Sequence, residues 1–585
     1  MANPSGTTVQ SSMGENLEIA KILETNRCPK TWDHFDLCLM TNGSKKARCR
    51  HCQKFFGHDS NSTLNKHLAK SCKPFRSGSD PTQANITPQG NIFVYNNEAL
   101  REQFTQLVIK KALPFDHFDD EDFTAVIQSY MQPGYIQVSR TTLRRDALKM
   151  WRMAREKMIL GFQEHCYGVS LTCDVWSAPY GTGFSYLAVT AHWMNQENWQ
   201  MMKRTIAFDL FGEPHTGANL FHLLKKVIVH YQLTGKIFSM SFDNASNNTN
   251  AVPRLKLLLN PIMDGKFFHT RCVAHVINLA VQDGLRVIEP IRIEFKEMIK
   301  SIFCQNNKRL NAYRKYCKSV NKLYLGPNLD CPTRWNSTWM MMHSALRQKE
   351  TLQMFHDGLA DRKKVPSKFS DEKWNIIAKL TDLLEVFKTA TTLLSGIYYP
   401  TSPLVLNQVY LMAQKIQDFE YEGPIFEEVG KAMVGKLLKY FDEIPLVFTC
   451  AAALNPTLNV GGVETLIESI AFAFNLTEGN PNFVTIQQKH FKDCFEKMFD
   501  IYTTKYGSTS NPIIDQMRHG ASSSRGGSSN ISLFNRLIES QSKKARSNAP
   551  TSEFGNYIST DFLSFMTFDE FENLDILAWW KEKET

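Results

Sequence analysis

The sequence predicts a multidomain α+β protein, in which a small metal-binding segment precedes an α/β core and a long run of helices. Three observations support this. Cysteine and histidine residues near the N-terminus have the spacing of a zinc site. Period-two and period-3.6 hydrophobic patterns alternate between residues 166 and 284. Helical stripes dominate residues 285–506. With 585 residues, 43% hydrophobic and 21% charged, the chain is long enough for several folded domains.

Composition argues against several classes of protein. Residues 1–10 have neither a basic start nor an apolar run, so no signal peptide is expected. The longest apolar stretch, residues 444–454, is too short to cross a bilayer, and no membrane partner is expected. Thirteen cysteines, scattered apart from one cluster, indicate reduced thiols in the cytosol or nucleus rather than a disulfide framework. No small-molecule substrate is expected either.

Nearly all of the net charge of +9 lies in one segment. Residues 27–76 hold eleven basic and three acidic side chains, a net charge of +8. Such an excess favours binding to a polyanion such as DNA, although a solvated basic surface would have the same composition. Residues 1–26, which precede this segment, lack a strong pattern and are expected to be disordered.

The basic segment carries a metal-binding pattern. Cys49 and Cys52 are separated by two residues, and after fourteen more residues His67 and Cys72 are separated by four. Three thiolates and one imidazole suit tetrahedral Zn²⁺, and so small a segment needs a metal to stay folded. We expect His67 to lie on a helix that begins near residues 60–62.

Trp32 and Phe35 precede the cysteine pair, and with them the segment resembles the BED zinc finger. The resemblance implies a ββα-like module that presents its helix to double-stranded DNA. Lys66, Lys70 and Lys73 would then contact phosphates rather than bases. The bases that are read do not follow from these residues.

A linker and a helical subdomain are expected next. Residues 77–91 are rich in Pro, Gly, Ser and Asn, as linkers are. Residues 92–165 have helical patterns, and Ser139 is predicted to cap a basic helix. The basic face of this helix has two interpretations. It is either a solvated surface or a second contact, with DNA or with another copy of the chain.

Residues 166–284 are expected to form the first part of the α/β core. Strands are predicted at residues 169–174, 184–194, 199–211, 237–242 and 266–271, with a helix at 220–231. Asp174 and Asp243 then end the first and fourth strands. This order resembles RNase-H-like nucleases and transposases, in which such carboxylates share Mg²⁺ ions. The alternative is that each Asp ends a strand because Asp favours turns.

Four motifs together resemble the hAT transposase superfamily, and with the finger in front the chain resembles its RICESLEEPER/DAYSLEEPER type. The motifs are LTCDVW with Asp174, SFDNAS with Asp243, RCVAHVINL at 271–279 and LDCPTRWNST at 329–338. The family implies an all-α insertion in the core, which residues 285–506 fit. It also makes Trp335 a candidate to stack on a DNA base, whereas the alternative is a core aromatic. Cys272 and His275 could ligate a metal, although such a pair is more often structural.

Residues 507–552 are Ser- and Gly-rich and are expected to form a flexible linker. Residues 553–585 include Trp579 and Trp580 and resemble the start of the hAT dimerisation region, which makes a homodimer a candidate assembly. In the family a third metal-binding Glu follows this region. The sequence ends at Thr585 without it, so the chain is expected to be truncated at the C-terminus.

These features predict a zinc-dependent nuclear DNA-binding protein that regulates transcription or chromatin. Loss of one metal-binding carboxylate should weaken catalysis by a factor of about 10²–10³ or more, so the chain is expected not to be an active enzyme. The alternative is an active hAT transposase that uses Mg²⁺ to cleave and join DNA.

Overall fold

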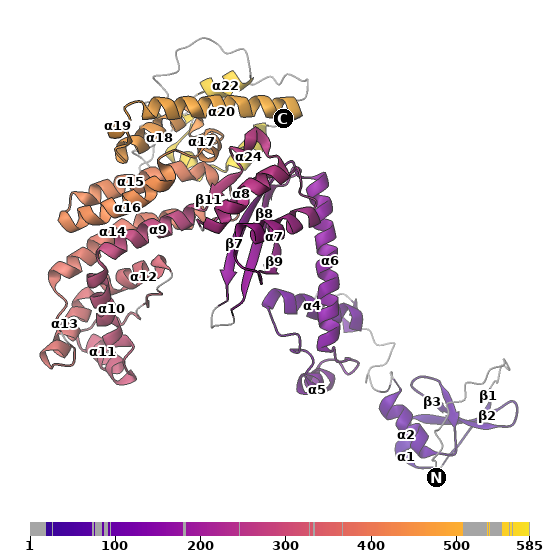
Figure 1. Ribbon diagram of the computed structural model, residues 1–585. Coiled ribbons are helices and arrows are strands. Elements are labelled where there is room, and N and C mark those ends of the chain that lie inside the picture. Colours follow the sequence, from indigo (N-terminus) through magenta and orange to yellow (C-terminus); the bar gives the residue numbers. More distant parts are fainter. Residues whose placement is uncertain are drawn as a thin grey trace. The chain divides into compact units, whose positions relative to one another are not determined.

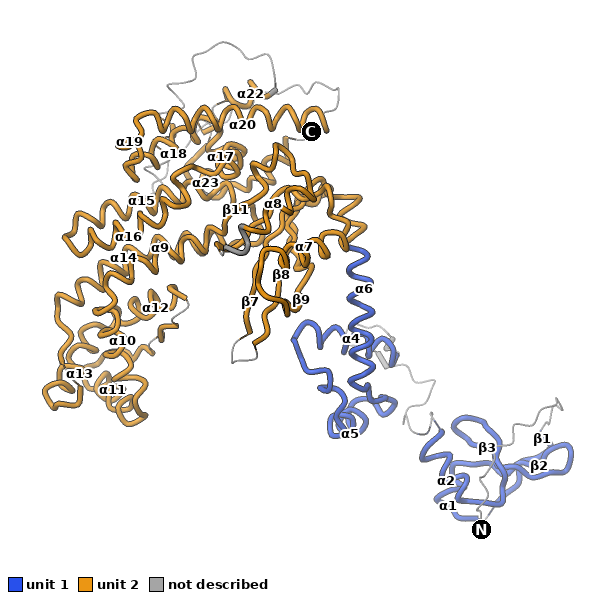
Figure 2. The backbone as a smooth tube through the Cα atoms, in the orientation of Figure 1, with its two compact units in different colours: residues 1–158 blue, residues 159–585 orange. Residues whose placement is uncertain are grey.

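The chain divides into two compact units, residues 1–158 and 159–585, which are described separately (Figure 2). The computed structural model describes residues 19–25, 27–72, 75, 85–86, 92–93, 95–178, 183–244, 246–326, 328–331, 334–365, 367–506, 535, 537–538, 553–560, 562–563 and 566–583.

The first unit begins with a four-stranded antiparallel sheet, in the order β1-β2-β3-β4, and two helices. The bounds are β1 Ile19–Leu23, α1 Pro29–Trp32, β2 Phe35–Met40, β3 Lys45–Cys49, β4 Phe55–Gly57 and α2 Asn61–Lys70. Eight buried residues form its core, including Trp32, Phe35 and Leu64. A core of this size does not stabilise a domain by hydrophobic burial alone.

Strand β1 departs from the prediction, because it lies within residues 1–26. It pairs with β2, with Ile19 opposite Met40 and Leu23 opposite Leu37. The edge of β2 supplies hydrogen-bonding partners that a local sequence pattern does not reveal. The finger module therefore contains four strands rather than the two of the expected ββα arrangement.

A helical part follows in the first unit. It contains β5 Asn85–Ile86, β6 Ile92–Phe93, α4 Asn97–Lys111, α5 Glu121–Tyr130 and α6 Arg140–Glu164, the last of which continues into the second unit. Val108, Phe118 and Leu143 are buried in its core. The predicted helix cap is confirmed, because Ser139 Oγ accepts a hydrogen bond of 3.3 Å from the backbone N–H of Thr142.

The second unit contains a five-stranded mixed sheet in the order β11-β10-β7-β8-β9 (Figure 1). The bounds are β7 Val169–Ser177, β8 Ser185–Met194, β9 Met201–Leu210, β10 Ile237–Phe242 and β11 His269–Arg271. The first three strands are antiparallel, whereas β10 is parallel to both β7 and β11. Each of the five predicted strands is present within a few residues of its expected bounds.

Helices accompany the sheet and dominate the rest of this unit. Those between the strands are α7 Gly217–His230 and α8 Ser246–Leu259, with a 3₁₀ turn at Ile262–Gly265. Those beyond the sheet are α9 Val273–Val287, α10 Glu289–Phe303, α11 Asn307–Ser319, α12 Trp335–Leu346, α13 Lys349–Asp361, α14 Asp371–Leu394, α15 Val405–Glu420, α16 Pro424–Phe441, α17 Leu446–Ala453, α18 Asn459–Ala473, α19 Leu476–Gly479 and α20 Phe483–Tyr506, with a 3₁₀ turn at Ser402–Leu404. None of the helices in the described residues is long and apolar enough to cross a membrane.

The last helices pack against earlier helices of this unit. They are α22 Glu553–Ser559, α23 Phe568–Asn573 and α24 Ile576–Lys583. Tyr557 Oη donates to the carbonyl of Ala453 at 2.7 Å, and Trp580 Nε1 donates to that of Leu454 at 2.8 Å. The stretch that resembles a dimerisation region therefore contacts the end of helix α17 and the residue that follows it within the same chain.

Replacing Gly217 with Ala is expected to lower the free energy of unfolding by about 1–3 kcal/mol. A Cβ at Gly217, in α7, would lie 2.7 Å from Asn250 Cβ and 2.9 Å from the Asn250 carbonyl carbon, in α8. Gly435→Ala is the matched control, because a Cβ there meets nothing within 4 Å and Ala favours the helix. Chemical denaturation measures both, and equal effects of the two substitutions would contradict the expected clash.

Candidate zinc and nucleic-acid sites

Cys49, Cys52, His67 and Cys72 come together in the first unit, with all ligand atoms within 4.8 Å of one another. Cys49 Sγ lies 3.6 Å from Cys72 Sγ, and Cys52 Sγ lies 3.3 Å from His67 Nε2. Tetrahedral Zn²⁺, with Zn–S of about 2.3 Å and Zn–N of about 2.0 Å, separates its ligand atoms by about 3.5–3.8 Å. The observed spacing of three sulfurs and one nitrogen therefore fits a zinc ion.

Local hydrogen bonds position the four ligands. Cys49 ends β3, where its N–H donates to the Lys54 carbonyl at 3.0 Å and its carbonyl accepts from Gln53 N at 2.9 Å. Gln53 has φ of 60°, so the chain turns sharply between Cys52 and β4. At the end of α2, Cys72 N donates to the His67 carbonyl at 2.7 Å, which fixes the second pair of ligands.

Protonation of these side chains would compete with zinc binding. Burial lowers the pKa of His67, and the charge of Lys54 lowers it further, which favours the neutral imidazole that ligates zinc. Burial raises the pKa of the Cys72 thiol to about 12, and the Cys49 and Cys52 thiols add to the rise. Zinc binding must displace such protons, so zinc affinity should fall as the pH falls.

Helix α2 presents basic side chains to solvent. Lys66 and Lys70 lie four residues apart and are exposed, whereas Leu64, His67 and Leu68 are buried. Lys73, the third predicted phosphate contact, lies outside the described residues. A helix with one face packed in the core and an exposed basic face has the arrangement needed to lie against DNA.

Asp174 and Asp243 are neighbours in the second unit. Strands β7 and β10 pair in parallel with Cys173 opposite Phe242. Asp174 and Asp243 are the next residues on the two segments, so they are adjacent. Strand β7 continues to Ser177, so Asp174 lies within the strand and not at its end. Burial raises the pKa of Asp174, and the charge of Asp243 raises it further, while His275 acts in the opposite direction.

The acid pair offers fewer candidate metal ligands than the zinc cluster. In the described part of the chain, the zinc ligands are the one group of three or more His, Cys, Asp or Glu residues close enough to hold a metal. Mg²⁺ commonly binds to one or two carboxylates and keeps several waters. Asp174 and Asp243 therefore fit a single hydrated Mg²⁺, but a two-metal site needs further ligands.

Comparison with known proteins gives a consistent result. Residues 172–267 match the family model of the ZBED1 RNase-like domain, and residues 270–383 match that of the ZBED1 RNase-like helical domain. The putative AC transposase of Zea mays is 25% identical, over 81% of this chain and 57% of its own length. The BED zinc-finger protein DAYSLEEPER of Arabidopsis thaliana is 22% identical, over 94% and 79%. RICESLEEPER 2 of Oryza sativa subsp. japonica is 21% identical, over 74% and 64%.

The chain is therefore similar to AC transposases and to BED zinc-finger proteins of the RICESLEEPER/DAYSLEEPER type, and its middle part is similar to the ZBED1 RNase-like domains. Its matches cover about 57% of the length of the maize transposases and 64% of RICESLEEPER 2. The predicted resemblance to hAT transposases and to the RICESLEEPER/DAYSLEEPER type is thereby confirmed.

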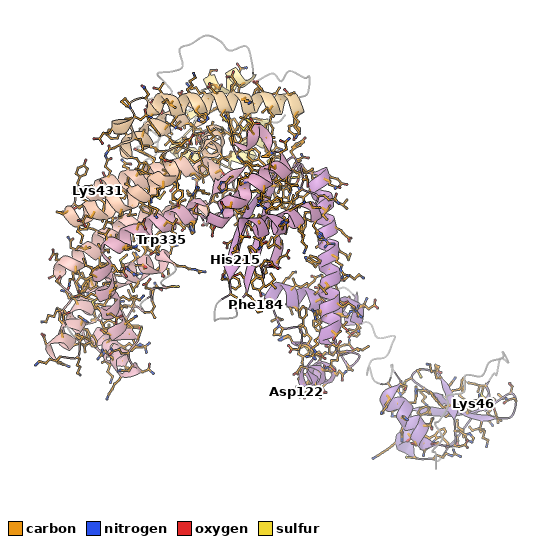
Figure 3. All side chains as sticks on the ribbon, viewed as in Figure 1. Lys46, Asp122, Phe184, His215, Trp335 and Lys431 are labelled. Atoms are coloured by element: carbon orange, nitrogen blue, oxygen red, sulfur yellow. The ribbon has the colours of Figure 1, made fainter. Side chains whose placement is uncertain are left out.

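Trp335 begins α12 and is only 3% exposed (Figure 3). It belongs to the large core cluster of the helical region. Its ring is therefore not available to stack on a base in this conformation, and the arrangement favours the core interpretation left open by the sequence.

Sequence reasoning missed a buried ionic cluster around Asp330, whose side chain is 0% exposed. Arg292 Nη1 and Lys296 Nζ lie 3.2 Å and 2.8 Å from Asp330 Oδ2. Ser337 and Thr338 donate hydroxyl hydrogen bonds to Asp330 Oδ1, at 3.3 Å and 2.7 Å. Asp330 and Ser337 stand in the quoted LDCPTRWNST motif, but nothing local indicates that the partners on α10 are Arg292 and Lys296.

Proposed function

We propose that this chain is a zinc-dependent nuclear protein that binds double-stranded DNA through its BED finger and regulates transcription or chromatin. One observation carries the proposal: three thiols and one imidazole at zinc spacing lie beside an exposed basic helix face. The names of the relatives, a transposase and BED zinc-finger proteins, support it. A homodimer is part of the same proposal, by family resemblance.

We further propose that the second unit is an RNase-H-like core, interrupted by the all-α region of residues 285–506. The strand order β11-β10-β7-β8-β9 and the adjacent acids on β7 and after β10 support this arrangement. The RNase-like match covers residues 172–267, within the core, and the helical-domain match begins in β11 and ends within the all-α region, at residue 383. The helical region would then follow the fifth strand of the core.

In this proposal the acid pair does not perform DNA cleavage. Among the described residues, Asp174 and Asp243 do not form part of a group of three or more metal-binding side chains. Two carboxylates with water hold one Mg²⁺ less rigidly than the shared site that two-metal phosphoryl transfer needs. In this proposal the zinc finger binds DNA, and the acid pair contributes no catalysis.

Replacing both Lys66 and Lys70 with Ala is expected to weaken binding to duplex DNA about tenfold or more. Removing two phosphate contacts should also reduce the slope of log affinity against log salt by about 2. Fluorescence anisotropy at several salt concentrations measures both quantities. The double variant Lys315→Ala, Lys318→Ala on α11 removes the same charge from the second unit and is the control. Equal losses for the two double variants would show that net charge, and not helix α2, determines binding.

The alternative function is an active hAT transposase, and the adjacency of Asp174 and Asp243 favours it. The test is a strand-transfer assay with Mg²⁺ or Mn²⁺ and terminal-repeat DNA, using the chain and its Asp174→Asn variant. The proposed function predicts DNA binding by both proteins and cleavage by neither. Robust cleavage that Asp174→Asn abolishes would establish the transposase instead.

A further inference from the structure

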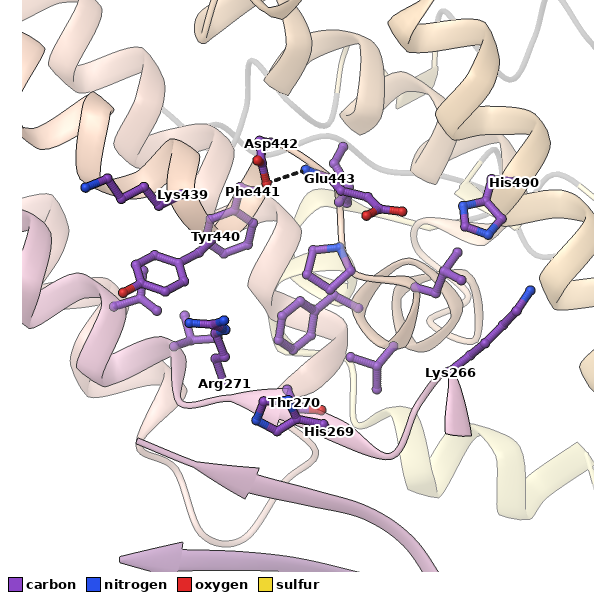
Figure 4. A pocket seen from close by; sticks show the side chains of 17 residues that line it. Lys266, His269, Thr270, Arg271, Lys439, Tyr440, Phe441, Asp442, Glu443 and His490 are labelled. Carbon is purple, nitrogen blue, oxygen red and sulfur yellow. Dashed lines mark hydrogen bonds between the residues drawn. The ribbon is translucent and has the colours of Figure 1, made fainter. Parts of the chain in front are cut away.

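A cavity of about 400 Å³ lies in the second unit (Figure 4). One side is formed by β11 and the start of α9, and the other by the end of α16 and the turn that leads into α17. Apolar side chains, among them Val276, Phe441 and Pro445, form part of the lining. This volume falls within the range of sites that enclose small ligands.

Basic groups gather around this apolar lining. Lys266, Arg271 and Lys439 line the cavity together with His490 from α20. Within the described residues, none of these four forms an ion pair with an acidic side chain of the chain. The acids Asp442 and Glu443 also line the cavity, so three permanent positive charges meet two negative ones.

Two polar groups of the lining indicate where a bound ligand would be held. The Arg271 guanidinium lies over the Tyr440 ring, 5.1 Å from its centroid, which holds the side chain at one side of the cavity. Thr270 Oγ1 is buried and has no hydrogen-bond partner among the described residues. A buried hydroxyl without a partner is costly, and a ligand atom would satisfy it.

We infer that this cavity binds a nucleoside 5′-phosphate unit, either as a free nucleotide or as an unpaired residue of a DNA strand. A planar base has partly exposed aromatic and apolar neighbours in Tyr440 and Pro445, and base–aromatic stacking is favourable. A phosphate suits Arg271, whose guanidinium donates two parallel hydrogen bonds to such a group. The inference does not depend on the zinc finger.

The position of Arg271 makes a DNA source chemically reasonable. In the β10–β11 pair Arg271 stands opposite Phe242, and Asp243 is the next residue after Phe242. A strand end that reached the acid pair would therefore pass close to Arg271. A free nucleotide needs no such path, so the two sources are separable by experiment.

The test is calorimetric titration of the full chain with dAMP, with inorganic phosphate, and with DNA duplexes that carry or lack one unpaired 5′-phosphorylated terminal nucleotide. If the site takes free nucleotides, we expect dAMP to bind more tightly than inorganic phosphate. If it takes DNA, we expect the duplex with the unpaired nucleotide to bind more tightly than the duplex without it. Arg271→Ala should weaken that binding about tenfold or more, and Arg271→Lys should weaken it less. Arg314→Ala is the matched control, because Arg314 also lies over a tyrosine ring, that of Tyr324 at 5.0 Å, outside the cavity.

The site is assigned to free nucleotides if dAMP binds and if Arg271→Ala weakens this binding while Arg314→Ala does not. The site is assigned to DNA if only the duplex with an unpaired nucleotide shows this pattern. If inorganic phosphate binds as tightly as dAMP, or if both arginine variants behave alike, the inference is wrong. Arg271→Lys keeps the charge, and unchanged far-ultraviolet circular dichroism of each variant excludes loss of fold as the cause.

Discussion

Replacing Cys72 with Ser is expected to unfold the finger module, release its zinc and reduce binding to duplex DNA by at least about 100-fold. The eight-residue core of this module is too small to stabilise it alone, whereas structural zinc contributes about 10–16 kcal/mol in small fingers. Removal of zinc with a chelator should have the same effect on DNA binding. Zinc content, measured by atomic absorption, and anisotropy with duplex DNA report the two losses.

Cys28→Ser is the control for this prediction, because Cys28 is an exposed thiol of the same module and is not among the four ligands. It should keep one zinc per chain and the affinity of the unaltered protein. The second unit should keep its thermal transition in both variants, because its core is separate. DNA binding that survives Cys72→Ser would show that the zinc-bound fold is not the DNA-binding element.

Asp330→Ala is expected to lower the free energy of unfolding of the second unit by about 3 kcal/mol or more. The substitution leaves Arg292 and Lys296, which are about one-fifth exposed, facing a site without the negative charge. It also removes the acceptor of the Thr338 hydroxyl and so detaches the start of α12 from α10. Urea denaturation followed by circular dichroism measures the change.

The same cluster gives a pH dependence. Burial alone would raise the pKa of Asp330, but hydrogen bonds from Lys296 and Thr338 and the charges of Lys296 and Arg292 outweigh it and hold the pKa below its usual 3.8. A carboxyl whose pKa is lower in the folded state stabilises the fold above the unfolded pKa and loses that contribution as the pH falls through the folded pKa. The difference in stability between Asp330→Ala and the unaltered chain should therefore shrink below pH 3.8.

An exposed acid is the control for the Asp330 prediction. Asp361 pairs with Lys368 at 2.8 Å, and its side chain is 63% exposed. Solvent screens such a pair, so Asp361→Ala should change the free energy of unfolding by less than about 1 kcal/mol. Similar losses for Asp330→Ala and Asp361→Ala would contradict the role assigned to the buried cluster.

Local patterns in the sequence predicted the features that local chemistry determines. The Cys49, Cys52, His67 and Cys72 spacing needs only one turn and one helix to close, and the structure brings the four together. The alternation around Asp174 predicted β7, because one face of that strand is buried. The adjacency of Asp174 and Asp243 depended on the strand order, and the structure places β7 next to β10.

Features that depend on distant partners could not be read in this way. The ring of Trp335 is buried because the helical region packs around it. The residues that flank Trp335 in the sequence do not indicate whether its ring is buried or exposed. Asp330 pairs with cations on α10, and Arg271 lies over the ring of Tyr440 on α16, and these partners are distant in the sequence. Strand β1 exists because β2 offers an edge, although residues 19–23 alone are a weak strand signal.

X-ray absorption at the zinc edge of the purified full chain tests the central claim most directly. We predict one zinc per chain, with three sulfur ligands at about 2.3 Å and one nitrogen ligand at about 2.0 Å. Addition of duplex DNA should leave this ligand set unchanged, because the proposed DNA contacts are made by helix α2 and not by the metal. A chain that binds DNA without zinc, or a zinc ion with mainly oxygen ligands, would contradict it.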